Sequence, residues 1–477
     1  MKQNRIISLL LGVGVVLTFI QCTPQKSSKP KRGSTTSTAT GWVFQNEQFT
    51  GNNGYASAGF VAQENYKPQI PAGMVLIEGG TFVMGEKTNM ITAEYNNSRR
   101  RVSVASFYMD KYEVSNLNWR EYTHWMELVF GKVAPELVAK TQPKINKSED
   151  PLSYNDPYFD RYYTHPAFNN YPVIGVSWEQ AMDYCQWRTD RLNELMLVKA
   201  GVLAEPNFAY VQRQTELDSI THNFVFNTEK YLLDRSYQPK PGSKPLRNAY
   251  GEVRKATMGD GLMFPNFRLP TEAEWEFAAY GLKANRNGVV EEGRMYPWSG
   301  NEVRSSKKGK QEGRMQANYM RGRGDMMGTA GALNDKYATT APVNAYPPND
   351  FGLYNMAGNV NEWVLDVYRP TSHKDVAEYN PFRGNSIFTY LTNKEKKSHF
   401  KIDSLGRIAY TVKENISSYK DGHNSIKTDF QLYTDPDGKR NLRNRRYLEQ
   451  DKATNDIGFR CVMTMLGSID NQGKKSN

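Results

Sequence analysis

Cysteine and histidine are the side chains in this chain whose chemistry depends most on spacing, because both hold metals when two or more lie close together. The 477 residues contain three cysteines, at 22, 185 and 461, and six histidines. No two cysteines are close in sequence, and no histidines show HxH or i, i+4 spacing. We therefore expect ordinary surface or core histidines, and we expect Cys185 and Cys461 to be buried thiols. A disulfide between these two is the alternative.

Cys22 follows an apolar run that is typical of a secretory signal. Two basic residues precede the run from Ile6 to Ile20, which is shorter than the roughly 20 apolar residues needed to span a bilayer. A cysteine at this point resembles the bacterial lipobox, in which the thiol is acylated, although Gln21 stands where that motif has a small residue. We expect a signal peptide at 1–21 and lipidation of Cys22. A signal that is simply cleaved is the alternative.

The residues after the cysteine predict where the chain is held. Residues 22–41 are rich in Ser, Thr, Pro and basic residues and contain no acid, which favours a flexible tether. Thr23 stands where an aspartate would retain many Gram-negative lipoproteins at the inner membrane. We therefore expect a lipid-anchored protein on the periplasmic face of the outer membrane, because several acyl chains together give stable anchoring.

Three later segments carry the signals of helices. Each begins with a residue that caps helix N-termini and continues with apolar residues at helical spacing. The predicted first residues are Ser115 or Asn116, Ser177, and Pro270 with Thr271. Between Met74 and Gly85, two short apolar alternations around a Gly-Gly pair predict a β-hairpin.

Glycines and aromatic residues continue from the tether nearly to the end without a second linker, which predicts one domain with insertions. We expect an N-terminal extension at 42–72, the domain at 73–465 and a disordered tail at 466–477. Two charged segments, about 196–262 and 385–440, interrupt the domain pattern. They are expected to be surface insertions and candidate partner-binding elements.

The formal net charge of +11 would suit a nucleic-acid ligand. The basic residues are scattered among 50 acids, however, and form no zinc-finger, basic-helix or ribonucleoprotein motif. We expect no nucleic-acid partner, and attribute the excess to solubility or to contact with an acidic protein or an anionic membrane.

Tryptophans at 178, 187, 275, 298 and 363 could together form a platform for sugar rings. Each lies beside helix or motif residues that are expected to face inward, so we expect these rings in the core.

Seven segments occur in the order GMVLIEGGTFVMG, FYMDKYEVSN, YPVIGVSWEQAMDYCQWR, FRLPTEAEWEFAAYG, YPWSGNE, PVNAYPPNDFGLYNMAGNVNEW and GFRC. They cover roughly residues 73 to 463, and together they resemble the formylglycine-generating-enzyme or sulfatase-modifying-factor family. The resemblance implies an α+β fold, a loop-rich variant of the C-type-lectin fold with little regular secondary structure and with surface insertions. Such a fold does not by itself imply an activity.

The resemblance also implies which metals to expect. Enzymes of this family hold copper with two cysteines a few residues apart near the C-terminus, and another branch holds iron with histidines. Neither set is present in this sequence, so we expect no copper, no iron and no enzymatic activity.

Two calcium sites are implied by similar positions in the family. The first comprises Asn355, Gly358, Val360 and Glu362, acting through two side chains and two backbone carbonyls, and the second comprises Asn318, Tyr319, Asp335 and Tyr337. Calcium prefers oxygen ligands of this kind. The alternative for the first site is that its asparagines close a turn and its glutamate forms a salt bridge, with no ion.

The whole layout resembles the J-type and K-type lipoproteins of the type IX secretion and gliding-motility apparatus, the J type more closely. We therefore expect a non-enzymatic structural component that binds other periplasmic and outer-membrane components of that machinery. The alternatives are an oxygen-dependent metalloenzyme of the same fold and a glycan-binding, lectin-like module.

Overall fold

The computed structural model describes part of the chain, and every structural statement below concerns that part. The described residues are 69–85, 99–146, 156–233, 242–244, 246–247, 252–280, 289–290, 296–300, 302–319, 337, 339–367, 378–382, 388–390, 401–412, 423–428, 444–449 and 451–467. The chain divides into two compact units, of which one, Met1–Ala62 with Asn248–Glu252, falls almost wholly outside these residues. Cys22, the predicted signal peptide and the predicted tether also lie outside them.

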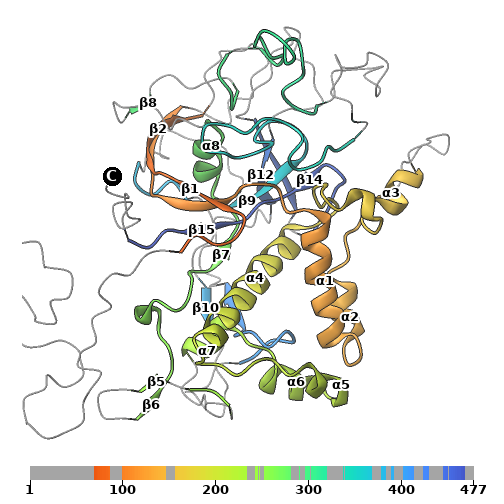
Figure 1. Ribbon diagram of the computed structural model, residues 1–477, viewed down its shortest axis with the longest axis vertical. Helices are drawn as coiled ribbons and strands as arrows, with labels where there is room; N and C mark the ends of the chain where they lie inside the picture. The colour runs from red at the N-terminus through yellow and green to blue at the C-terminus, as the bar shows by residue number, and fades with distance from the viewer. Residues whose placement is uncertain are drawn as a thin grey trace, which may run out of the picture. The chain divides into compact units, whose positions relative to one another are not determined.

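The strands form several small sheets, joined by long loops and accompanied by helices (Figure 1). One antiparallel sheet has the order β1 (Met74–Ile77), β4 (Phe107–Asp110), β15 (Val462–Thr464), β7 (Phe267–Arg268). A second has the order β13 (Asn444–Glu449), β12 (His423–Thr428), β9 (Asn361–Val367), β14 (Ile457–Gly458). The mixed α+β class is confirmed.

The remaining strands pair in smaller groups. β2 (Gly80–Met84) lies between β3 (Arg100–Val104) and β8 (Val289–Val290). Two further pairs are β5 (Leu246–Arg247) with β6 (Val253–Arg254), and β10 (Phe388–Tyr390) with β11 (Tyr410–Val412).

The predicted hairpin between Met74 and Gly85 is wrong, because its two strands enter different sheets. β1 pairs with β4, whereas β2 pairs with β3 and β8. Gly79, between them, lies so close to β3 that a Cβ there would be 2.3 Å from the Val104 carbonyl oxygen. Its amide donates to Ser106 Oγ at 3.0 Å. The Gly-Gly pair therefore permits close backbone packing between sheets and does not form a two-residue turn.

The three predicted helices are confirmed, and reciprocal side-chain caps start each one. They are α1 (Asn116–Phe130), α4 (Trp178–Lys199) and α8 (Glu272–Tyr280). At α4, the amide of Gln180 donates to Ser177 Oγ at 3.2 Å, and the Ser177 amide donates back to Gln180 Oε1 at 2.8 Å. Such a capping box satisfies two backbone donors that the first turn leaves free. The helix starts are thus set locally.

Shorter helices fill the connections. They are α2 (Pro135–Ala139), α3 (Asp156–Tyr162), α5 (Phe208–Arg213), α6 (Leu217–Asn223) and α7 (Thr228–Leu233). No helix among the described residues combines the length and the apolar character that crossing a membrane requires.

The main core lies where α1 and α4 meet the strands. Trp119 of α1 stacks on Tyr184 of α4 with ring centroids 5.4 Å apart, and Phe459 meets the same indole edge-on at 5.8 Å. Trp275 and Trp363 are fully buried, as expected. All residues of α8 are buried, so this short helix forms part of the interior.

Both segments expected to be surface insertions contribute to the interior. In the first, Val211, Ile220 and Phe224 pack into the main core. In the second, Ile408 is 2% exposed and Leu405 packs against the main core. A polar composition predicted exposure, but a few apolar residues at the right positions are enough to bury parts of each segment.

Candidate functional site

A buried ion pair lies at the centre of the molecule. Glu362 of β9 and Arg460, between β14 and β15, are 1% and 0% exposed as side chains. Arg460 Nη2 donates to Glu362 Oε1 at 2.6 Å and Nε donates to Oε2 at 2.8 Å, while the indole of Trp275 on α8 donates to Oε2 at 2.8 Å. Arg460 Nη2 also donates to the Tyr354 carbonyl at 3.0 Å. The pair ties β9, α8 and the chain end together.

A second acid, Glu113, lies next to this pair. It accepts from Asn355 Nδ2 at 2.9 Å and from Asn359 Nδ2 at 2.9 Å. Burial, and to a smaller extent the Glu362 charge, raise the pKa of Glu113 to about 8, although the Arg460 charge and the hydrogen bonds from the two asparagines lower it. Both asparagines have positive φ, 51° and 71°, a backbone region in which asparagine is favoured among residues with a side chain. The loop 355–359 is therefore folded around Glu113.

The two cysteines of the domain meet beside a third acid. Cys185 Sγ and Cys461 Sγ are 3.5 Å apart, and both thiols are free and buried. Asp110 accepts from Arg188 Nη1 at 2.7 Å and from the Cys461 amide at 3.0 Å. Burial raises the pKa of Cys461 well above its ordinary value, and the contact with Cys185 raises it further. The prediction of buried thiols is confirmed.

The first predicted calcium site fits this geometry only in part. Asn355 Oδ1 is buried and has no hydrogen-bond partner among the described residues, so one oxygen suited to a cation is present. Both carboxylate oxygens of Glu362, however, are bound by Arg460, and Trp275 also binds one of them. A carboxylate neutralised in this way does not serve as a calcium ligand. Glu362 therefore forms the salt bridge that was the alternative to an ion.

Residues of the two predicted calcium sites contact each other. A Cβ on Gly358, where φ is 78°, would lie 2.2 Å from the Asn318 carbonyl oxygen, and the Asn359 amide donates to that oxygen at 2.8 Å. Val360 is buried and begins the approach to β9.

The second predicted site is described at three of its four positions. Asn318 Nδ2 donates to the Thr339 carbonyl at 2.7 Å, Tyr319 packs against the core around α8, and Tyr337 contacts Tyr346 with ring centroids 6.4 Å apart. Asp335 lies outside the described residues. Within the described residues, no cluster of three or more His, Cys, Asp or Glu side chains could hold a metal.

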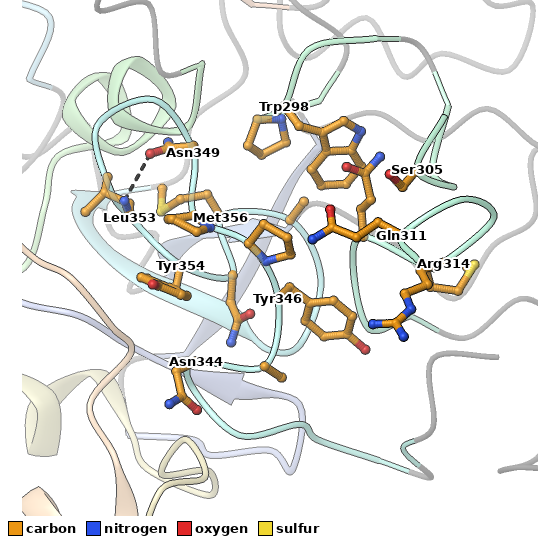
Figure 2. A pocket seen from close by; sticks show the side chains of 18 of the residues that line it. Trp298, Ser305, Gln311, Arg314, Asn344, Tyr346, Asn349, Leu353, Tyr354 and Met356 are labelled. Carbon is orange, nitrogen blue, oxygen red and sulfur yellow. Dashed lines mark hydrogen bonds between the residues drawn. The ribbon is translucent and has the colours of Figure 1, made fainter. Parts of the chain in front are cut away.

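An open cavity of about 550 Å³ lies in front of Asn355. Loops 297–299, 305–316 and 344–357 supply nearly all of its wall. In Figure 2, Trp298 and Tyr346 lie on opposite sides of it, and Gln311 and Arg314 reach in from a third loop. Its lining contains aromatic rings, prolines, amides and hydroxyls but no cysteine or histidine. Trp298 is thus the one tryptophan of the predicted set that lines this cavity.

Sequence reasoning missed Glu113, Asp110 and Arg460. Asp110 and Glu113 lie in the mixed segment FYMDKYEVSN, whereas Arg460 is a charged residue inside an apolar stretch, GFRCVM. A charge in such a setting is a usable signal, because a buried charge is stable only when it is paired.

The chain is similar to several known proteins. The mouse formylglycine-generating enzyme is 27% identical over 328 residues, which is 65% of this chain and 61% of that protein. The mouse inactive C-alpha-formylglycine-generating enzyme 2 is 38% identical over 104 residues, 22% of this chain and 27% of that protein. The solved structure of PvdO from Pseudomonas aeruginosa covers 82% of this chain and 94% of its own, with 16% identity and a TM-score of 0.41.

The chain matches only about 61% of the length of the mouse enzyme. The model of the sulfatase-modifying factor enzyme 1-like domain, in contrast, matches residues 61–465, which is most of the chain. This protein therefore belongs to the sulfatase-modifying factor, or formylglycine-generating-enzyme-like, family.

Proposed function

We propose that this protein is a non-enzymatic outer-membrane lipoprotein and a structural component of the type IX secretion and gliding-motility machinery. Its support is the layout of the chain: a lipoprotein start, Gly41-Trp42 ahead of the domain, and RRYLEQDKATNDIGFRC near the end. These features resemble the J-type lipoprotein of that machinery more closely than the K type. The C-type-lectin relationship of the fold is part of the same proposal.

The burial of the thiols is the observation that carries the non-enzymatic role. Cys185 and Cys461 are 1% and 0% exposed, and neither lines the cavity in front of Asn355. Copper(I) chemistry on a substrate thiol needs thiolates that the substrate can reach. Here burial raises the pKa of the Cys461 thiol, which disfavours its thiolate.

A peptide-conversion assay tests this role. The purified chain is supplied with copper(I), oxygen and a peptide that contains one cysteine, and peptide conversion is followed by mass spectrometry. We expect no conversion above that given by copper with the heat-denatured chain. Conversion above this background would make the protein an oxygen-dependent metalloenzyme and overturn the proposal.

The structural role requires protein partners at the first insertion. Leu233 of α7, within that segment, is 41% exposed, and Leu117 of α1, outside it, is 49% exposed. A photo-crosslinking amino acid at 233 should capture a secretion component in intact cells, and the same probe at 117 serves as the matched control. Equal capture at both positions, or none at 233, would contradict partner binding through this insertion.

Structural calcium stays part of the proposal with an altered ligand set. Asn355 Oδ1 and the carbonyls of Gly358 and Val360 are retained, whereas Glu362 is removed because Arg460 binds it. We expect a chelator to lower the melting temperature of the parent chain but not of Asn355→Ala. If the chelator has no effect on the parent and the chain holds no calcium, the asparagines only close a turn. The second site stays a prediction.

A further inference from the structure

The cavity in front of Asn355 holds several polar side chains that the protein itself does not use. Gln311, Arg314 and Asn344 line it, and none of them makes a side-chain hydrogen bond to another described residue. All three are exposed side chains, so water or a ligand supplies their hydrogen-bond partners. A ligand with both donors and acceptors replaces that water.

The aromatic part of the cavity is held in place from behind. Trp298 stacks on Tyr296 with ring centroids 5.0 Å apart and an interplanar angle of 4°. The indole also donates to the Glu302 carbonyl at 2.9 Å. With one face covered and its N–H engaged, Trp298 is a fixed apolar surface. Tyr346 lies across the cavity from it (Figure 2).

The described lining of the cavity carries a net positive charge. Within it, Lys307 and Arg314 are basic and Asp350 is the one acid. A guanidinium binds a carboxylate through two parallel hydrogen bonds, and its planar shape favours that group over a neutral one. An anionic ligand is therefore preferred over a neutral or cationic one.

We propose that this cavity binds a carboxylated pyranose sugar. The C–H face of such a ring carries partial positive charge and packs on the negative face of an indole, while its hydroxyls donate to and accept from planar amides. A volume of about 550 Å³ holds one or two sugar units, and small-molecule sites usually measure roughly 300–1,000 Å³.

An acidic peptide is the competing ligand class. Its carboxylate would satisfy Arg314, but a peptide carries few hydroxyls for the amides of Gln311 and Asn344. The lining thus favours the sugar. Two sources share its chemistry: a muramic acid unit of the cell wall, and a uronic acid of an exported polysaccharide.

The test is titration calorimetry of the full chain, with tryptophan fluorescence as a second signal. The ligands are N-acetylmuramic acid, galacturonic acid, neutral N-acetylglucosamine and a short acidic peptide. We expect saturable binding of a carboxylated sugar, and whichever acid binds more tightly identifies the source. Arg314→Gln should weaken that binding about tenfold, since a hydrogen bond to a charged group contributes roughly this factor. The binding of N-acetylglucosamine should not change.

Two further variants separate local from general effects. Trp298→Phe should weaken the binding of acidic and neutral sugars alike, because it reduces the stacking surface and leaves the charge of the cavity unchanged. Lys308→Gln removes the same charge as Arg314→Gln from the same loop, but Lys308 does not line the cavity, so its binding should equal that of the parent. Equal loss in Lys308→Gln and Arg314→Gln, binding of the peptide alone, or no saturable sugar binding would each overturn the proposal.

Discussion

Replacing Glu362 with glutamine removes one charge from the centre of the molecule and keeps the shape of the side chain. Arg460 then keeps its own charge, with 0% exposure, and loses the carboxylate that three of its hydrogen bonds reach. Removing one partner of a buried pair costs about 3–5 kcal/mol. The glutamine oxygen can still accept from Trp275 or from Arg460, so we expect a loss near the lower end, about 3 kcal/mol.

The assay is urea unfolding of the purified chain, followed by tryptophan fluorescence, with excess chelator and with excess calcium. Since Glu362 is bound by Arg460, the loss in Glu362→Gln should be the same in both conditions. Arg460→Met should lose a similar amount, because it leaves the glutamate buried and unpaired. The loss in the double variant should be smaller than the sum of the two single losses, by at least about 2 kcal/mol, as expected for side chains in direct contact.

Two results would refute this reasoning. A loss in Glu362→Gln that appears with calcium and disappears with chelator would make Glu362 an ion ligand and Arg460 a bystander. Additive single losses would show that the two side chains do not stabilise each other in the folded protein. Either result would return Glu362 to the calcium site that the family resemblance implied.

Three further predictions concern the anchor, the thiols and the sheet junction. Cys22→Ala should move the protein from the membrane fraction to the soluble fraction with an unchanged melting temperature; retention in the membrane would contradict the anchor. In the folded Cys22→Ala variant, Cys185 and Cys461 should resist alkylation. In denaturant without reductant, both should react, and a failure to react would indicate a disulfide between them. Gly79→Ala should cost about 1–3 kcal/mol by overpacking, because its Cβ meets a carbonyl at 2.3 Å. Gly259→Ala, with its nearest atom at 3.6 Å, should be near neutral in the same unfolding assay.

The features that could be predicted from the sequence are those that neighbouring residues determine. α1 and α4 begin at serines whose side chains pair with residues three positions later, so both the cap and its partner are visible in a short stretch. The apolar face of α1, with Trp119, Tyr122 and Met126, follows from helical spacing in the same way.

The features that could not be predicted depend on residues far apart in the chain. Cys185 and Cys461 touch across 276 positions, and Glu113 meets Asn355 across 242. The hairpin prediction failed for the same reason: the partner of β1 is β4, which lies beyond β2 and β3. Local alternation predicts that a strand exists, but it does not predict which strand will pair with it.

The buried network explains why resemblance to the family specifies the fold here without specifying an activity. Glu113 comes from FYMDKYEVSN, Trp275 from FRLPTEAEWEFAAYG, Asn355 and Glu362 from NMAGNVNEW, and Arg460 from GFRC. These four segments therefore meet in one set of hydrogen bonds and ion contacts in the interior. Loss of any member leaves a buried charge or polar group unpaired, which costs stability whether or not the protein catalyses anything. Of the loops that form the cavity, 344–357 supplies Asn355 and the Tyr354 carbonyl to this network. Loops 297–299 and 305–316 supply none of the residues named above, so their side chains can change with the ligand while the fold stays the same.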